Sequence, residues 1–115
     1  MAKTQTNNLT NSCLRFLNVM GYKAWRNNNN AVYDVKAKSF RKNPSTLLGV
    51  PDIIGFNKTT GKFIGVEIKV GKDRLSPEQK DFQKIALDSG CICIVVKEIN
   101  DLINNKEIWN QTKHN

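Results

Sequence analysis

Hydrophobic and polar residues alternate along residues 63–70, which run Phe-Ile-Gly-Val-Glu-Ile-Lys-Val. Alternation with a period of two predicts a half-buried β-strand, whose successive side chains point to opposite faces of a sheet. The aliphatic side chains that then share the buried face are Ile64, Val66, Ile68 and Val70. Glu67 and Lys69 project together from the other face, which makes this strand the first candidate for a functional site.

Helical periodicity appears on both sides of this strand. Along residues 7–20 apolar positions recur every three or four residues, and a glycine follows as a stop signal. A second helix is predicted to begin at Ser76 as N-cap, with Pro77 in the first helical position and Gln79 as capping-box partner. Gly90 is expected to end that helix.

Short strands are predicted around polar turns. Residues 22–26 and 31–35 have the composition of strands and flank the turn-prone asparagine run at 27–30. Residues 51–56 are predicted to form a strand that a Thr- and Gly-rich turn joins to residues 63–70 as a hairpin.

The C-terminal part of the chain completes the pattern. Residues 91–96 form a continuous apolar run, which is typical of a strand inside a sheet that is covered on both faces. Residues 98–104 are predicted to be a short helix, and Ile108 and Trp109 are the apolar residues expected to dock the tail. The whole order predicts an α/β fold, a mixed β-sheet flanked by helices, in a single domain over residues 1–115.

The net charge of the chain favours a polyanionic partner. Eighteen basic and ten acidic residues give a net charge of +8, with a pI near 9.6. Residues 36–48 lose all periodicity and contain basic residues without an acidic one, so we expect a mobile basic loop there. Nucleic acid is the commonest partner for such a charge, and a basic protein with no such partner is the alternative.

Several site classes are disfavoured. No stretch approaches the roughly 20 apolar residues of a membrane span, and the polar residues 1–12 lack a signal-peptide pattern, which points to the cytosol. The cysteines Cys13, Cys91 and Cys93 are odd in number and have no C-x-x-C spacing, while the single histidine, His114, lies at the C-terminal end. Buried, reduced thiols are therefore expected in place of a zinc site.

Asp52 supplies a second carboxylate to the candidate site. It lies fifteen positions before Glu67 and enters from the neighbouring strand. Phosphodiester hydrolysis needs an activated water and stabilised charge, which Mg²⁺ or Mn²⁺ on hard oxygen ligands provides. We predict that Asp52, Glu67 and the Ile68 carbonyl hold the metal, and that Lys69 orients the water or offsets phosphate charge. The alternative is a solvated Glu67–Lys69 ion pair with Asp52 in a turn.

An ordered set of motifs carries a family resemblance. The set comprises Trp25-Arg26-Asn27, Gly49-Val50-Pro51-Asp52, Glu67-Ile68-Lys69, Leu75-Ser76-Pro77-Glu78-Gln79 and Gly90. Over residues 9–102 the chain resembles the VRR-NUC family, whose fold is the PD-(D/E)xK nuclease core and whose smallest members are stand-alone phage and bacterial domains. The resemblance implies a Mg²⁺- or Mn²⁺-dependent nuclease in the cytoplasm of a bacterial or phage-infected cell.

The resemblance also assigns Gln79 and exposes one departure. A glutamine at this place belongs to the family's active-site motif, so Gln79 is expected to be catalytic as well as a capping residue, the two roles alternating. Relatives usually carry a glutamate on the first helix, but this chain has no acidic residue before Asp34. A second metal is thereby in question, and Asp34 is either a substitute or a surface residue at a strand end.

Basic residues near the site are candidates for DNA contacts. The residues expected to bind phosphates are Arg26, Lys36, Lys38, Arg41, Lys42, Lys72 and Arg74. A solvated basic loop is the alternative for those in 36–48. Trp25 is expected in the core. No residue is assigned to base edges, so no sequence specificity is predicted.

The leading hypothesis is a structure-selective DNA endonuclease, acting as a homodimer on Holliday junctions or other branched DNA. Stand-alone VRR-NUC domains of this size resemble junction resolvases, and paired cuts need two active sites where one chain supplies one. Two alternatives remain open, namely a non-catalytic nucleic-acid-binding module with a degenerate nuclease fold and a general or nicking nuclease.

Overall fold

The computed structural model describes residues 2–27, 32–41 and 47–112. The helices are α1 (Ala2–Val19), α2 (Pro77–Asp88), α3 (Ile99–Ile103) and α4 (Lys106–Thr112). The strands are β1 (Tyr22–Arg26), β2 (Val32–Asp34), β3 (Ser39–Arg41), β4 (Ile53–Asn57), β5 (Phe63–Ile68) and β6 (Ile92–Val96). Within these ranges, no helix is long and apolar enough to cross a membrane.

The main sheet is mixed, as predicted. Its strand order is β1-β4-β5-β6, in which β1, β4 and β5 are antiparallel neighbours and β6 runs parallel to β5. The β4–β5 hairpin predicted from the sequence is confirmed, with Ile53 opposite Val66. In the parallel pair, Glu67 lies beside Val95, so these two side chains point to the same face.

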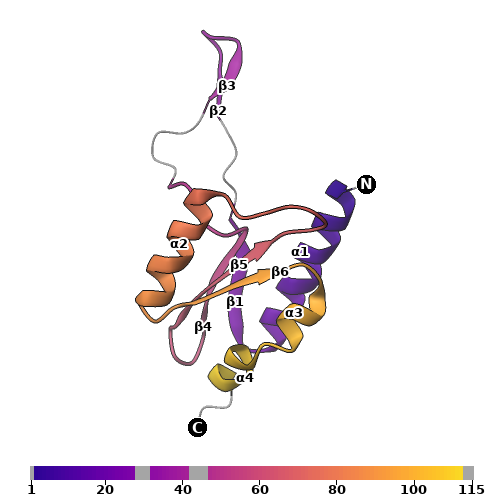
Figure 1. Cartoon of the computed structure of the whole chain (residues 1–115), viewed down its shortest axis with the longest axis vertical. Coiled ribbons are helices and arrows are strands. Elements are labelled where there is room, and N and C mark those ends of the chain that lie inside the picture. Colours follow the sequence, from indigo (N-terminus) through magenta and orange to yellow (C-terminus); the bar gives the residue numbers. More distant parts are fainter. Residues whose placement is uncertain (1, 28–31, 42–46, 113–115) are drawn as a thin grey trace.

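Helices cover both faces of this sheet (Figure 1). α1 and α3 contact each other and pack on one face, where the core joins Cys13 and Leu17 of α1 to the buried face of the strands. α2 packs on the opposite face, against β6. The predicted alternation in β5 is confirmed because Ile64, Val66 and Ile68 belong to this core. Glu67 therefore lies on the α2 face.

The local signals at α2 are also confirmed. Ser76 caps the helix, and its hydroxyl accepts a hydrogen bond from the Gln79 backbone amide at 3.2 Å. Pro77 occupies the first position and Gly90 follows the end with a φ of 87°. The predicted short helix corresponds to α3.

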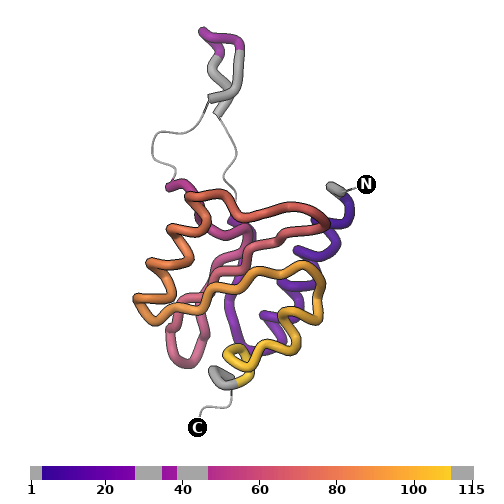
Figure 2. The backbone as a smooth tube through the Cα atoms, in the orientation of Figure 1, coloured from indigo at the N-terminus to yellow at the C-terminus, as the bar shows by residue number. Residues whose placement is uncertain are grey.

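The prediction for residues 31–48 is wrong in part. The strand predicted at 31–35 is found as β2, but it pairs with β3, so Ser39–Arg41 is a strand where a mobile basic loop was expected. Figure 1 shows this hairpin extending away from the four-stranded sheet, and Figure 2 traces the backbone of the sheet and of the helices that flank it. A three-residue strand is too short to show periodicity, so its pairing with β2 could not be seen in the sequence.

Other differences concern position within the fold. β6 is an edge strand, although helices cover both of its faces as its apolar run predicts. The tail forms α4, in which Ile108 is buried and the Trp109 indole donates to the Ile103 carbonyl at 2.6 Å. Trp25 does not enter the core: it is 43% exposed and its ring meets Phe56 edge-on at 6.3 Å.

Candidate active site

Asp52 and Glu67 meet where β4 begins beside the end of β5. The Asp52 carboxylate accepts a hydrogen bond from the Ile68 backbone amide through Oδ2 at 2.8 Å, which fixes it across the strand pair. The backbone amide of Asn27, the residue after β1, donates to the Asp52 backbone carbonyl at 2.8 Å, so the end of β1 also positions Asp52. Asp52 is exposed, whereas Glu67 is only 1% exposed. One carboxylate thus opens to solvent above another that is buried.

The residues around Asp52 explain why its motif contains glycine and proline. Gly49 has a φ of +84°, and any side chain there would overlap the Glu78 carbonyl of α2. Pro51 is buried over Gly65 of β5, where an added Cβ would lie 2.7 Å from the Pro51 Cγ. The segment before Asp52 is therefore packed tightly between α2 and β5, because both contacts need a residue without a side chain.

Burial and the neighbouring carboxylate control the charge of Glu67. Removal from water, followed by repulsion from the Asp52 carboxylate, raises the pKa of Glu67 from 4.5 to about 8. The Lys69 ammonium acts in the opposite direction and only partly offsets this shift in pKa. Without a cation the pair holds a proton near neutral pH, as two carboxylates sharing one site do.

The buried carboxylate also has an unused acceptor. Glu67 Oε2 is buried and has no hydrogen-bond partner among the described residues. Leaving such an atom unpaired costs free energy, so it marks a position for a proton, a water or a cation. The donor set of Asp52, Glu67 and a backbone carbonyl is the hard-oxygen chemistry that Mg²⁺ and Mn²⁺ prefer.

Gln79 fixes the other oxygen of Glu67. Its side-chain nitrogen Nε2 donates to Glu67 Oε1 at 3.1 Å, while its Oε1 accepts from the Ser76 amide at 2.8 Å. The two ends of the Gln79 side-chain amide therefore make the capping contact and the contact with Glu67 at the same time. Phe82, one turn further along α2, packs on Phe63 of β5 with ring centroids 6.5 Å apart and holds this helix face on the sheet.

Lys69 follows β5 directly and extends its pairing. Its backbone amide donates to the Val96 carbonyl at 3.0 Å, and its half-buried side chain lines a groove beside the end of β6. Lys72 and Arg74, predicted from the sequence, line the same groove. Lys80 and Lys97 also line it and were missed, because their proximity depends on the packing of α2 and β6.

A polar hollow of about 450 Å³ lies on the α1 side of Asp52. Thr6 and Thr10 of α1 line it, together with Arg26 and Asn27. The part of the chain that the structure describes contains no cluster of three or more His, Cys, Asp or Glu side chains suited to a metal. The carboxylates that the described residues bring together at this site are Asp52 and Glu67.

α1 holds Arg26 in place. The guanidinium donates to Asn11 Oδ1 at 3.1 Å and to Asn7 Oδ1 at 3.3 Å. An arginine fixed at the mouth of this hollow presents charge beside Asp52 without neutralising it. The arrangement suits a phosphate near the carboxylates.

The remaining predicted residues lie outside this centre. Lys36 and Lys38 are exposed on the turn of the β2–β3 hairpin, and Arg41 belongs to β3. Lys42 falls outside the described residues. Asp34 belongs to β2, which pairs only with β3, so the structure does not bring it to Asp52.

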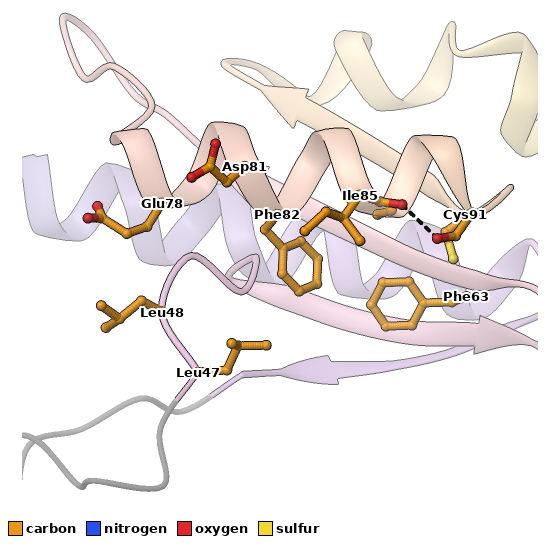
Figure 3. Close-up of a pocket in the computed structure, with 10 residues that line it drawn as sticks. Leu47, Leu48, Phe63, Glu78, Asp81, Phe82, Ile85 and Cys91 are labelled. Carbon is orange, nitrogen blue, oxygen red and sulfur yellow. Dashed lines mark hydrogen bonds between the residues drawn. The ribbon is translucent and has the colours of Figure 1, made fainter.

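A separate hollow on the α2 face is apolar (Figure 3). Phe63 and Phe82 lie side by side in it, and Leu47 and Leu48 approach from the segment before Gly49. It contains neither Asp52 nor Glu67. Its chemistry does not contribute to the carboxylate site.

Comparison with known proteins assigns this arrangement to a family. The sequence pattern of the VRR-NUC domain matches residues 6–97, a range that includes Asp52, Glu67, Lys69 and Gln79. The chain belongs to the VRR-NUC family. The resemblance inferred from the motifs is thus confirmed over most of the chain.

Solved structures support the same fold. A structure described as a VRR_NUC domain is similar with a TM-score of 0.56 and 14% identity, covering 95% of each chain. The Holliday junction resolvase Hjc of Archaeoglobus fulgidus, an archaeal hyperthermophile, is similar with a TM-score of 0.51 and 21% identity. That match covers 80% of this chain and 67% of the resolvase. No curated protein matches the sequence.

The VRR-NUC assignment and the resolvase-like sheet establish the PD-(D/E)xK nuclease fold for this protein. The predicted fold class is confirmed. The protein is a VRR-NUC nuclease domain, and its substrate and the roles of single residues follow as proposals.

Proposed function

We propose that this protein is a metal-dependent endonuclease that hydrolyses phosphodiester bonds in branched DNA. The observation that carries the proposal is the Asp52–Glu67 pair: a buried carboxylate with an unpaired oxygen, beneath an exposed carboxylate, inside a VRR-NUC fold. A solvated surface ion pair, the alternative considered for Glu67 and Lys69, does not account for a glutamate that is 1% exposed.

The chain's own oxygens would hold the metal. Asp52, Glu67 and the Ile68 carbonyl are the proposed ligands of Mg²⁺ or Mn²⁺, and the raised pKa of Glu67 fits a site where a cation replaces a proton. The bound ion supplies Lewis-acid stabilisation of the charge that develops on the phosphate. The Ile68 amide and Gln79 orient the two carboxylates, one hydrogen bond each.

Lys69 is proposed to act on the reacting phosphate. It follows directly after the strand that contains Glu67 and lines the groove, so its ammonium can stabilise the non-bridging oxygens or orient the attacking water. Arg26, Lys72 and Arg74 are proposed to bind flanking phosphates. Lys36, Lys38 and Arg41 of the hairpin are proposed to bind DNA further from the site, and Lys42, which follows them in the sequence, is proposed as another phosphate contact.

Branched DNA and a homodimer form the finer part of the proposal. Symmetric incision of a four-way junction needs two active sites, whereas this chain contains one Asp52–Glu67 pair. The similarity in fold to a Holliday junction resolvase supports this substrate, as does the net charge of +8.

A non-catalytic DNA-binding module is the second candidate. Thr6 and Thr10 stand in the α1 hollow where relatives place an acid, and a site with fewer acidic ligands binds metal more weakly. The complete set of Asp52, Glu67, Lys69 and Gln79 favours catalysis.

The test is incubation with labelled linear duplex, flap and four-way-junction DNA, with and without Mg²⁺ or Mn²⁺. We expect metal-dependent cleavage that favours the junction, and no cleavage by Asp52→Asn. Sedimentation should give about twice the 13.0 kDa chain mass. DNA binding without cleavage under any of these conditions would support the second candidate, and a monomer that degrades linear duplex equally well would indicate a general nuclease.

A further inference from the structure

A basic groove lies beside Lys69 at the β6 edge of the sheet. It is formed by the β5–α2 connection, the first turn of α2 and the end of β6, and its volume is about 730 Å³. The cationic residues that line it are Lys69, Lys72, Arg74, Lys80 and Lys97. Asp73 is the one acidic residue among the residues that line it.

The charge of this groove is not neutralised within the described chain. None of its five cationic side chains forms an ion pair with a described residue. The salt bridge found among the described residues joins Lys84 to Asp88 at 3.1 Å, further along α2. Lys72, Arg74, Lys80 and Lys97 are exposed. Cations gathered in a concave surface repel one another and raise the local concentration of anions, so the groove is suited to a polyanion.

The groove continues the active site on one side. Val95, which lines it, is the parallel partner of Glu67 and points to the same sheet face. The hollow with Arg26 lies toward β1 and β4, the other side of Glu67 in the strand order. A DNA strand whose scissile phosphate lies over Asp52 and Glu67 would therefore meet a cationic surface on each side of that phosphate.

We propose that the groove binds the sugar–phosphate backbone of the cleaved strand on the β6 side of the scissile bond. Lys80 and Lys97 are the new phosphate-binding residues, and Lys72 and Arg74 act with them. The inference rests on the proposed DNA substrate. Ammonium groups on flexible stems bind phosphates without reading bases, so this contact gives affinity but no sequence preference.

Binding of a 5′-labelled four-way junction in EDTA, measured by fluorescence anisotropy over a KCl series, tests the groove. K80Q/K97Q should bind more weakly, and its plot of log affinity against log salt should be shallower by up to about 1.8, since each phosphate contact contributes about 0.9. The matched control K58Q/K62Q removes the same charge at the β4–β5 turn, at the other end of β5, and should keep the wild-type slope.

A second variant is expected to change DNA binding in the opposite direction. D73N removes the groove's one carboxylate and should tighten binding and steepen the salt dependence, which a misfolded protein would not do. The groove proposal would be overturned if K80Q/K97Q and D73N both kept the wild-type salt slope, or if K80Q/K97Q and K58Q/K62Q lost the same amount of DNA affinity. Either result would leave the nuclease proposal intact. A wild-type protein that does not bind DNA would overturn both.

Discussion

Gln79 and Glu67 are joined by a hydrogen bond of 3.1 Å between the amide Nε2 and the carboxylate Oε1. The same amide completes the capping box of α2 through its oxygen, which accepts from the Ser76 amide at 2.8 Å. The start of the helix and the orientation of the buried carboxylate therefore depend on one side chain. Glu67 Oε2 stays available because Oε1 is held.

The two ends of the Gln79 amide can be separated by mutation. Glu at this position keeps a capping-box acceptor but places a carboxylate against Glu67, so Q79E should lower the cleavage rate and Mn²⁺ affinity about 10- to 100-fold. S76A removes the hydroxyl cap and should cost about 1 kcal/mol of folding stability with little effect on cleavage. Rate assays, calorimetric Mn²⁺ titration and thermal melts measure these effects. Equal activity in Q79E and wild type would mean that the helix cap is the whole role of Gln79.

Asp52 has a structural role, its hydrogen bond with the Ile68 backbone amide, and a proposed chemical role as a metal ligand, and mutation can separate the two. Asn keeps an oxygen that can accept from the Ile68 amide, whereas Ala leaves that amide unpaired at a cost of about 1 kcal/mol or more. D52N and D52A should both abolish cleavage and weaken Mn²⁺ binding, while only D52A loses stability in urea melts. Junction binding in EDTA should persist in both because a repulsive charge is removed. Wild-type cleavage by D52N would show that Asp52 is not a metal ligand.

Lys69 is expected to act in the transition state and Lys72 in binding. K69Q should lower single-turnover cleavage strongly with little change in junction affinity, because an interaction made only in the transition state leaves binding unchanged. K72Q, on the same groove, should weaken affinity with a smaller effect on the rate at saturation. The same pattern in both variants would reduce Lys69 to an ordinary phosphate contact.

Local signals explain what the sequence could predict. The order Ser76, Pro77 and Gln79 specifies a helix start through contacts between near neighbours, and the alternation about Glu67 specifies which face of β5 is buried. These depend on a few consecutive residues. The proximity of Asp52 and Glu67 could also be predicted, because a short turn joins β4, which begins after Asp52, to β5.

Non-local packing explains what the sequence could not predict. The partner of β2 was hidden because Ser39–Arg41 is short, and the edge position of β6 was hidden because two covered faces give the same apolar run in any strand position. Trp25 was placed in the core by its size, but it points to the sheet face that α1 does not cover. Lys80 and Lys97 come together only through the fold.

Pro51 and Gly65 should be coupled in stability. A Cβ at Gly65 would lie 2.7 Å from Pro51 Cγ, so G65A should cost about 1–3 kcal/mol, the range for overpacking. P51A removes the clashing Cγ, and the double variant should lose less than the sum of the single losses. Urea denaturation of the four proteins gives the coupling free energy. Additive losses would show that the Gly65 substitution acts elsewhere, since Cys93 Sγ is 3.3 Å from the same Cβ.

The raised pKa of Glu67 gives the metal-free protein a particular pH dependence. Burial and Asp52 raise this pKa from 4.5 to about 8, so between these values the folded chain binds a proton that the unfolded chain has released. Stability in EDTA should therefore fall as pH rises from about 5 to 8, because rising pH favours whichever state binds fewer protons, and here that is the unfolded state. Cys13 and Cys93 stay protonated in this window, their pKa values being raised to about 11 chiefly by burial. E67Q cannot release a proton and should lose this slope in thermal melts, while the other titrating groups remain as in wild type. An unchanged slope in E67Q would show that Glu67 is already ionised in the folded, metal-free protein.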